Sequence, residues 1–323
     1  MQQPQPYPYT QSPYMVESKA LKKTGNFVAF ILLAMLAMQL LLRALSSVGL
    51  LDIVFFWADG HATSLIANMI TYVLSLAVPA VLVAQACRCG IKPFPSKPVS
   101  GTVFSLGVAG GMAVAIFANV VAGWLMAWMS ALGVPQPEMP DMLEPTAMSF
   151  VLNLIYTGVL AAVVEEMVFR GYILGALRAH GDGIAVVVSA ALFGLFHGNV
   201  LQLPFAFLLG LALGYLVVKT DSIWPSVLLH FINNAMSVTL TFLEKRYGMD
   251  GNAITLFTFS VVSLVGAAAL TVVAVCRQPF TPLTNGLSLF RVSTRVGKLL
   301  TAPAMVAALI ILFWNLLVSM GVV

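Results

Sequence analysis

Nine continuous apolar runs constrain this chain more than any other feature of its sequence. They lie near residues 26–45, 64–86, 102–129, 147–178, 183–199, 203–219, 223–243, 254–276 and 299–320. Most of them reach the roughly 20 residues that a helix needs to cross a bilayer. The runs are continuous rather than alternating, so the spans must be helices. Charged residues make up 9% of the chain, against about 25% in soluble domains. The sequence therefore predicts an all-α, polytopic helical membrane protein with about nine transmembrane helices.

Basic residues indicate how the chain crosses the membrane. With the N-terminus in the cytoplasm, the inner connections carry 13 of the 16 Lys and Arg residues, and the outer loops carry 7 of the 12 Asp and Glu residues. This bias agrees with the positive-inside rule. The plain tail and minimal loops are typical of a bacterial plasma-membrane protein, which is the location we predict. The net charge of +4 reports topology and contact with the lipid bilayer, and we expect no nucleic-acid partner.

Four segments are expected along the chain. Residues 1–25 are predicted to form a disordered cytoplasmic N-terminal tail, and residues 26–146 the N-terminal transmembrane spans. A Pro-rich stretch near 134–145 then precedes the segment 147–245, whose spans hold almost all the intramembrane polar chemistry. Residues 246–323 supply the C-terminal transmembrane spans. The three cysteines, Cys87, Cys89 and Cys276, lack the spacing of a metal site and are expected to be free thiols.

Glu165 and Glu166 lie inside the fourth apolar run and are followed by Arg170. A carboxylate near the bilayer centre costs roughly 2.5–3.5 kcal/mol, so its presence predicts a functional site. Glu166 and Arg170 are four residues apart and share a helix face, which predicts an ion pair. Glu165 lies about 100° round the helix without that partner, and desolvation should raise its pKa toward the value that suits a general base. The alternative is that both glutamates are interface charges at the end of a shorter span.

Two later spans carry histidines. Phe193 and His197 are four residues apart, so the ring of Phe193 can pack against the imidazole. His230 and Asn234 also share a face, whereas Asn233 is expected to point elsewhere. Taken singly, each histidine is more often a packing residue than a catalyst. Ser189 and Ser226 lie nearby and are predicted to be helix-packing hydroxyls.

Helix rise places these polar groups at similar depths. At about 1.5 Å per residue, Glu165 and His197 each lie about 20 Å from the cytoplasmic ends of their spans. His230 and Asn234 lie roughly 10–16 Å from the start of theirs. Unpaired, each polar group would be costly to bury. The coincidence of depth predicts one buried reaction chamber formed by three helices.

The pattern Glu-Glu-x-x-x-Arg, Phe-x-x-x-His and His-x-x-x-Asn, in this order on successive spans, closely resembles the CPBP family. This family comprises the type II CAAX prenyl endopeptidases and the bacteriocin-processing or immunity (Abi) membrane proteases. The resemblance covers about residues 147–240, and every motif is intact. It implies an intramembrane endopeptidase that hydrolyses membrane-tethered peptide or protein substrates.

The resemblance also implies roles for individual residues. Glu165 and His197 would activate the attacking water, and His230 with Asn234 would stabilise the oxyanion. Glu166, Arg170 and Phe193, which belong to the same motifs, would be supporting residues. No cofactor is favoured. The alternative is a divalent metal such as zinc held by Glu165, His197 and His230, although no histidine is followed by Glu as in the common zinc-protease motif.

Two further functions remain compatible with the sequence. A transporter could use the same carboxylates and histidines to relay protons or bind ions, but it usually shows internal repeats, which we do not find. A non-enzymatic scaffold or immunity protein could bind a membrane partner, yet it would not need all of these polar positions. For the endopeptidase, we expect substrates to reach the chamber laterally or from the cytoplasm.

Overall fold

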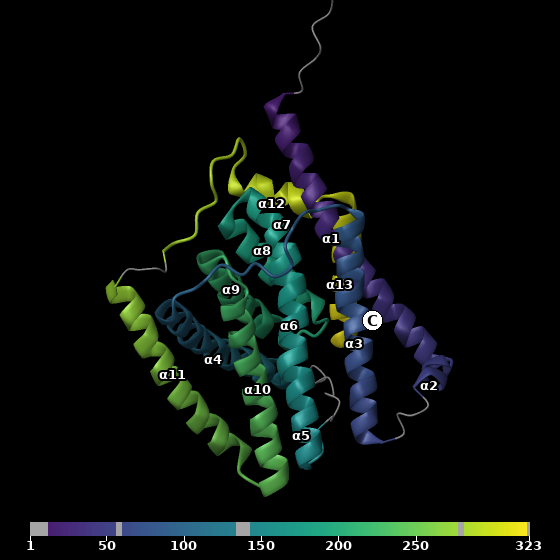
Figure 1. Ribbon diagram of the computed structural model, residues 1–323, viewed down its shortest axis with the longest axis vertical. Helices are drawn as coiled ribbons and strands as arrows, with labels where there is room; N and C mark the ends of the chain where they lie inside the picture. The colour runs from purple at the N-terminus through teal and green to yellow at the C-terminus, as the bar shows by residue number, and fades with distance from the viewer. Residues whose placement is uncertain (1–11, 56–59, 134–142, 277–280, 322–323) are drawn as a thin grey trace, which may run out of the picture.

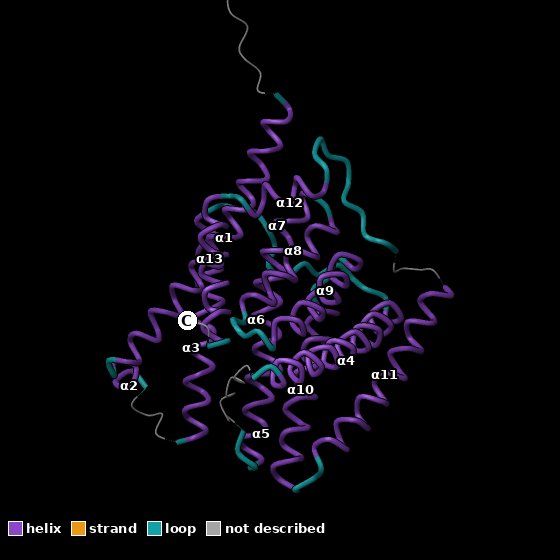
Figure 2. Tube along the Cα trace, turned by 180° about the vertical axis from the view of Figure 1, so that it is seen from behind, coloured by secondary structure: helices purple, strands orange, loops and turns teal. Residues whose placement is uncertain are grey.

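The computed structural model describes residues 12–55, 60–133, 143–276 and 281–321, except for the side chains of 275 and 276. These residues form helices and connecting loops, and no strand is assigned within the ranges described. Figure 1 shows the bundle, and Figure 2 shows it from behind. The elements before the core are α1 (Pro13–Ser47), α2 (Leu50–Val54), α3 (His61–Ala86) and α4 (Gly101–Ala131). The later elements are α5 (Ala147–Asn153), η1 (Leu154–Leu160), α6 (Ala161–Glu166), η2 (Met167–Ile173), α7 (Leu174–Leu177), η3 (Arg178–His180), α8 (Asp182–Phe196), α9 (Gln202–Thr220), α10 (Trp224–Tyr247), α11 (Gly251–Cys276), α12 (Val292–Leu300) and α13 (Pro303–Ser319).

The described helices confirm an all-α membrane protein with fewer clear spans than the nine predicted. Seven helices are long and apolar enough to cross a bilayer, and α12 with α13 forms an eighth candidate bent by 78°. The remaining apolar run becomes α8, which has only 15 residues. At 1.5 Å per residue it is about 22 Å long, short of the ~30 Å hydrocarbon core. It therefore enters the molecule and ends near the site, and the chain returns through α9.

The start of α1 corrects the predicted tail. Residues 13–25 are helical rather than disordered, while residues 1–11 lie outside the described part. Leu21 is fully buried in this stretch, and α12 packs against it. Lys298 Nζ also donates to Ser18 Oγ at 2.9 Å. Composition alone missed this because the contacts come from residues about 280 positions later. The predicted segment boundaries at 146 and 245 stay predictions.

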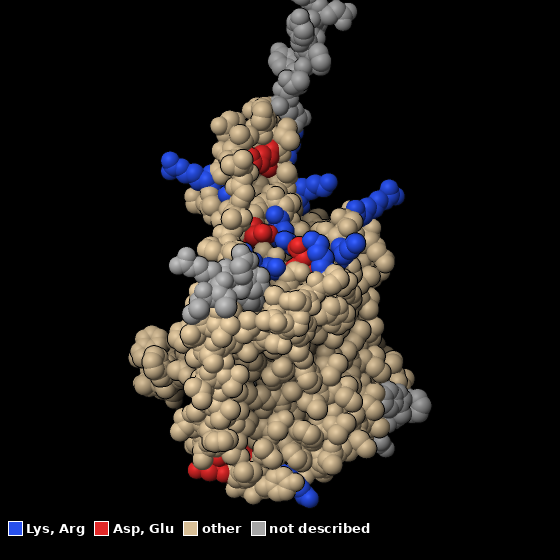
Figure 3. Space-filling model, turned by 60° about the vertical axis from the view of Figure 1, so that its left-hand side comes forward, with Lys and Arg blue, Asp and Glu red and all other residues tan. Residues whose placement is uncertain are grey.

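Charged side chains gather at the two ends of the molecule and leave an uncharged belt between them (Figure 3). We call one end the basic end; it is defined by Lys97, Arg178, Lys219 and Arg295. There, Asp221 Oδ2 accepts from Lys97 Nζ and Asp221 Oδ1 from Arg178 Nη1, each at 2.7 Å. We call the opposite end, at the start of α5 and the end of α10, the acidic end, and it carries Glu144 and Glu244. The belt is the part of the surface that a bilayer would cover.

Small residues bring the core helices close together. In Figure 2, α4 crosses the bundle at a steep tilt relative to α10. A Cβ on Gly111 of α4 would meet Leu229 of α10 at 2.4 Å, and one on Gly210 of α9 would meet Ala190 of α8 at 3.1 Å. Close backbone approach is the usual basis of helix association in membranes. Gly214, four residues after Gly210, is also in close contact, since a Cβ there would lie 3.2 Å from Leu174.

Candidate active site

The two glutamates close the short helix α6, which lies between two π-helical stretches, η1 and η2. A π-helix bonds residue i to i+5 and is rare in proteins, where it is often found at functional sites. Its wider turn changes the direction in which successive side chains point. Glu165 and Glu166 thus lie at the end of a six-residue stretch of regular α-helix. The π-helical segments on either side do not follow the α-helical period of 3.6 residues per turn.

Glu166 forms the predicted ion pair with Arg170. Arg170 Nη1 lies 3.2 Å from Glu166 Oε1, and both side chains are 0% exposed. The guanidinium also donates from Nη2 to the carbonyl oxygen of Gly210 at 3.4 Å and stacks over the ring of Phe193 at 4.4 Å. These contacts hold a charge pair in a site that excludes water. The prediction of pairing from four-residue spacing is confirmed.

Glu165 has a different surrounding. Its side chain is 15% exposed, and its Oε1 accepts a hydrogen bond from Tyr72 Oη at 2.5 Å. Tyr72 lies on α3, 93 residues upstream of Glu165, and the ring of Tyr156 packs edge-on against it at 5.6 Å. No motif marks Tyr72 in the sequence.

His230 lies between the two carboxylates. Its Nδ1 is 3.1 Å from Glu166 Oε1, and its Nε2 is 3.7 Å from Glu165 Oε2. The first contact is a hydrogen bond, whereas the second exceeds the normal range. The Nε2 position therefore remains available to another partner in the cavity.

His197 follows the last residue of α8, where the short helix ends. Its Nδ1 lies 2.8 Å from the Phe193 carbonyl oxygen, and the Phe193 ring packs edge-on against the imidazole at 4.8 Å. Nδ1 must donate in that hydrogen bond, because a carbonyl oxygen only accepts. Nε2 of neutral His197 then carries a lone pair. The predicted Phe193–His197 packing is confirmed.

Asn234 lines the same cavity, and so does Asn233, which was predicted to point elsewhere. Asn233 Nδ2 donates to Asn234 Oδ1 at 3.1 Å, and Asn234 Nδ2 donates to the Thr157 carbonyl oxygen at 2.9 Å. The prediction for Asn233 was wrong because the cavity is wide enough to reach two adjacent positions of α10. Ser189 is a packing hydroxyl as predicted, since it is buried and donates to the Val186 carbonyl of its own helix. Ser226 is buried and donates to the Ile223 carbonyl, but it also contacts the carboxylate of Glu166 and so lies beside the site.

A cavity of about 660 Å³ joins these side chains, and we call it the chamber. Its lining includes Glu165, His197, His230 and Asn234, together with Tyr72 and Phe193. The helices that contribute these groups are α3, α6, α8 and α10. The structure thus brings together the polar groups that helix rise placed at similar depth. Glu166 and Arg170 lie behind the wall, in the dry core.

The donor atoms of the site do not fit a zinc ion as they are arranged. A catalytic zinc needs three protein donors that converge to about 2.0–2.2 Å from the ion. Among the residues the structure describes, no three His, Cys, Asp or Glu side chains form such a group. Glu165, His197 and His230 share the chamber without converging on a point.

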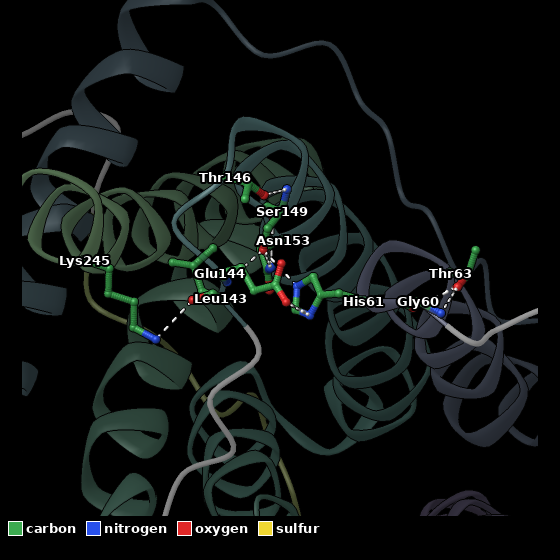
Figure 4. Close-up of polar contacts among 9 residues, drawn as sticks. All are labelled: Gly60, His61, Thr63, Leu143, Glu144, Thr146, Ser149, Asn153 and Lys245. Atoms are coloured by element: carbon green, nitrogen blue, oxygen red, sulfur yellow. Dashed lines mark hydrogen bonds and ion pairs between the residues drawn. The ribbon is translucent and has the colours of Figure 1, made fainter.

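A second polar cluster at the acidic end has the composition of a serine triad (Figure 4). His61 Nε2 lies 3.0 Å from Ser149 Oγ, and His61 Nδ1 lies 3.3 Å from Glu144 Oε1. However, Ser149 is 1% exposed, and its Oγ also accepts from the Glu144 backbone N–H and from Asn153 Nδ2. A nucleophile needs an open approach. The cluster therefore fastens the start of α3 to the start of α5 and is structural.

Comparisons with known proteins place the chain in a family context. Residues 147–236 match the family model described as Type II CAAX prenyl endopeptidase Rce1-like. A similar protein of Bacillus subtilis (strain 168) bears the name "Putative membrane peptidase YdiL" and is 25% identical over 131 residues. That match covers 40% of this chain, and it spans about half, 53%, of the relative's length. No solved structure matches the chain. These findings support a CPBP family domain at residues 147–236, and the described helices are those of a multi-pass membrane protein.

Proposed function

We propose, on the premise that residues 147–236 carry the Rce1-like domain of the CPBP family, that the chain is an intramembrane endopeptidase. Its substrates are membrane-tethered peptides or proteins. The observation that carries this proposal is the chamber, where Glu165, His197, His230 and Asn234 from separate helices line one cavity inside the apolar belt. Its depth in the belt and its polar lining fit hydrolysis better than passive packing.

Glu165 is the proposed general base. The Tyr72 hydroxyl occupies its Oε1, so Oε2 faces the chamber and takes a proton from water. The second hydrogen of that water bonds to Nε2 of His197, which carries a lone pair because Nδ1 is committed to the Phe193 carbonyl. The water oxygen attacks the peptide carbonyl carbon. The proton on Glu165 then moves to the leaving amine as the C–N bond breaks.

His230 and Asn234 are the proposed oxyanion donors. An imidazolium at His230 donates Nδ1–H to Glu166 and directs Nε2–H into the chamber, 3.7 Å from Glu165 Oε2. Asn234 commits one Nδ2 hydrogen to Thr157 and keeps the second for the oxyanion. Donors that are already in place cost no reorganisation when the negative charge develops.

Charge balance supports this assignment. Glu165 and Glu166 contribute two negative charges, and Arg170 with protonated His230 contributes two positive charges. Three of the four side chains are at most 5% exposed, and Glu165 is 15% exposed. A neutral cluster avoids the several kcal/mol that an uncompensated buried ion costs. Arg170 contacts Glu166, and Glu166 in turn contacts His230 Nδ1, so both are positioning residues.

The orientation follows from the charges at the two ends. We propose that the basic end and the N-terminal side of α1 face the cytoplasm of a bacterial plasma membrane, because cytoplasmic connections are enriched in Lys and Arg. The basic end of the described structure holds Lys97, Arg178, Lys219 and Arg295. A reporter that is active only in the cytoplasm should then be active when fused at residue 92. A reporter that is active only outside the cytoplasm should be active when fused at residue 249.

Glu165→Gln tests the peptidase. Membrane-protein termini are compared by mass spectrometry between cells with wild type and cells with the variant at matched expression. We expect new termini that depend on Glu165, whereas the variant keeps its melting temperature in detergent because the amide is nearly isosteric. Identical profiles of termini in cells with wild type and cells with Glu165→Gln, under several growth conditions, would refute the proposal. That result would favour a scaffold or transport function.

A chelator tests whether Glu165-dependent cleavage requires a metal ion. We expect a zinc chelator to leave Glu165-dependent cleavage by the purified protein unchanged within twofold. Loss of cleavage with recovery on added zinc would contradict this and would assign Glu165, His197 and His230 as ligands. Metal content of the purified protein gives an independent readout.

A further inference from the structure

The chamber does not stop at the proposed catalytic groups but continues along α10 toward the acidic end. Its lining includes His230, Asn234, Ser237, Thr241 and Glu244. These positions are spaced by three or four residues and therefore follow one face of the helix. The wall is completed near its far end by the first turns of α11, at Gly251, Thr255 and Phe259.

Exposed positions occur along this face beyond the proposed catalytic groups. His230 is 4% exposed, Asn234 and Thr241 are partly buried, and Ser237 and Glu244 are exposed. Ser237 lies in the middle of a membrane-spanning helix, where an exposed hydroxyl facing lipid would have no partner from the solvent. A hydrated groove explains its exposure. We call this part of the chamber the α10 groove.

The opposite direction is closed. Beyond the glutamates toward the basic end, the helix core contains Phe169, Arg170, Ile173, Leu174 and Leu177, each at most 1% exposed. Between α9 and α8, Gly210 brings the backbones into contact at Ala190. A peptide has no passage through this packing without moving the core helices.

We infer that the chamber is entered from the non-cytoplasmic side through the α10 groove. The inference rests on the proposed function for its substrate class: membrane-tethered proteins whose scissile bond lies at the non-cytoplasmic side of the bilayer. An extended segment of the substrate lies along Ser237 and Thr241 and presents its peptide bond to Glu165. The sequence had suggested entry laterally or from the cytoplasm, whereas the lining of the chamber points to the other face.

Thiol accessibility tests the direction of entry without any assay of proteolysis. Native Cys87 is exposed and lies at the basic end, where α3 ends, so it reports on that side. One protein keeps Cys87 alone; a second carries Ser237→Cys with Cys87, Cys89 and Cys276 replaced by Ser. Both are treated in intact cells with a charged, membrane-impermeant thiol reagent, and again after permeabilisation.

We expect Ser237→Cys to react in intact cells at least tenfold faster than Cys87, which reacts only after permeabilisation. Thr241→Cys is the second variant, in case the first fails to fold. Thr239→Cys is the matched control, because Thr239 lines a separate apolar cavity between α4, α10 and α11 and should react slowly in both conditions. Protection of both groove cysteines in intact cells, or labelling of Cys87 there, would overturn the inference.

Filling the groove tests the substrate path. Thr241→Trp should reduce Glu165-dependent cleavage at least tenfold, mainly through KM, whereas Thr239→Trp should cleave at the wild-type rate. Equal cleavage by both variants would contradict the path. If Glu165→Gln changes no termini while Ser237→Cys is still labelled from outside, the proposed peptidase function is refuted, but the opening of the α10 groove to the non-cytoplasmic side is supported. If Glu165-dependent cleavage is found and the labelling is reversed, only the direction of entry fails.

Discussion

At the scale of single residues, the Tyr72 hydroxyl fixes one oxygen of Glu165 and leaves the other for water. Tyr72→Phe removes this hydrogen bond and keeps the ring. Because small misplacement of a catalytic group costs up to about 100-fold, we expect kcat to fall roughly 10- to 100-fold with little change in KM. Tyr172→Phe is the matched control, since Tyr172 is buried near Cys89 and away from Glu165. Cleavage assays should show wild-type kcat for Tyr172→Phe, and the same result for Tyr72→Phe would remove Tyr72 from the site.

Arg170 neutralises a carboxylate in a fully buried pair. Arg170→Ala removes the guanidinium that pairs with Glu166, and breaking a buried pair in this way costs about 3–5 kcal/mol. We expect a clear fall in melting temperature in detergent. The double variant Glu166→Gln, Arg170→Met should recover most of the stability, because both charges are removed together, but not the activity, because His230 loses its carboxylate partner. A melt of Arg170→Ala that overlays wild type would refute the pair.

Local spacing predicted much of this chemistry and missed the rest for physical reasons. Glu166 and Arg170 interact over one helical turn, so their pairing could be read from the sequence. Tyr72 reaches Glu165 across 93 residues, and no local period encodes that contact. Asn233 was placed away from the site because spacing defines a helix face but not the width of the cavity that it faces.

At the scale of elements, η2 depends on a glycine that lets a loop approach it. A Cβ on Gly171 would lie 2.1 Å from the carbonyl oxygen of Pro93. Gly171→Ala must push that backbone away, and we expect a loss of about 1–3 kcal/mol, as in overpacked cores. Gly123→Ala in α4 meets nothing within 4 Å and should gain about 0.5–1 kcal/mol. Equal melting temperatures for the two variants would contradict the contact.

The lengths of elements were predicted less well than their existence. Every apolar run became a helix, because burial in lipid leaves the backbone no other bonding partner. The limits of α8 and α12 depended on tertiary contacts instead. The run to residue 199 ends as helix at Phe196, where the chain turns at Gly198 with φ 60°. Likewise, the last run, 299–320, becomes α13, and a separate amphipathic helix, α12, precedes it and packs against α1.

At the scale of the whole molecule, Asp221 ties three segments together at the basic end. The hydrogen bond from Lys97 and, to a smaller extent, the hydrogen bond from Arg178 hold the pKa of Asp221 below its usual value. A lowered folded-state pKa stabilises the protein above the unfolded value and is lost as the pH falls through the folded value. Melts of wild type and Asp221→Asn should therefore differ at pH 7, and the difference should begin to shrink once the pH falls below about 4 and keep shrinking at lower pH. A difference in melting temperature that does not shrink as the pH is lowered from about 5 would contradict this role.

The last helices pack against the first. Asn26 Oδ1 in α1 accepts from the backbone N–H of Ala304 in α13 at 3.1 Å, and a Cβ on Gly25 would strike Leu299. Roughly 250 residues lie between the end of α1 and the start of α13. At 5–20 residues per second, a ribosome needs roughly 13–50 s to make them. During that interval α3 can already pack against α1, but the face of α1 that carries Gly25 and Asn26 lacks its native neighbour, so the yield of the protein in a cell depends on what covers that face until synthesis reaches α13.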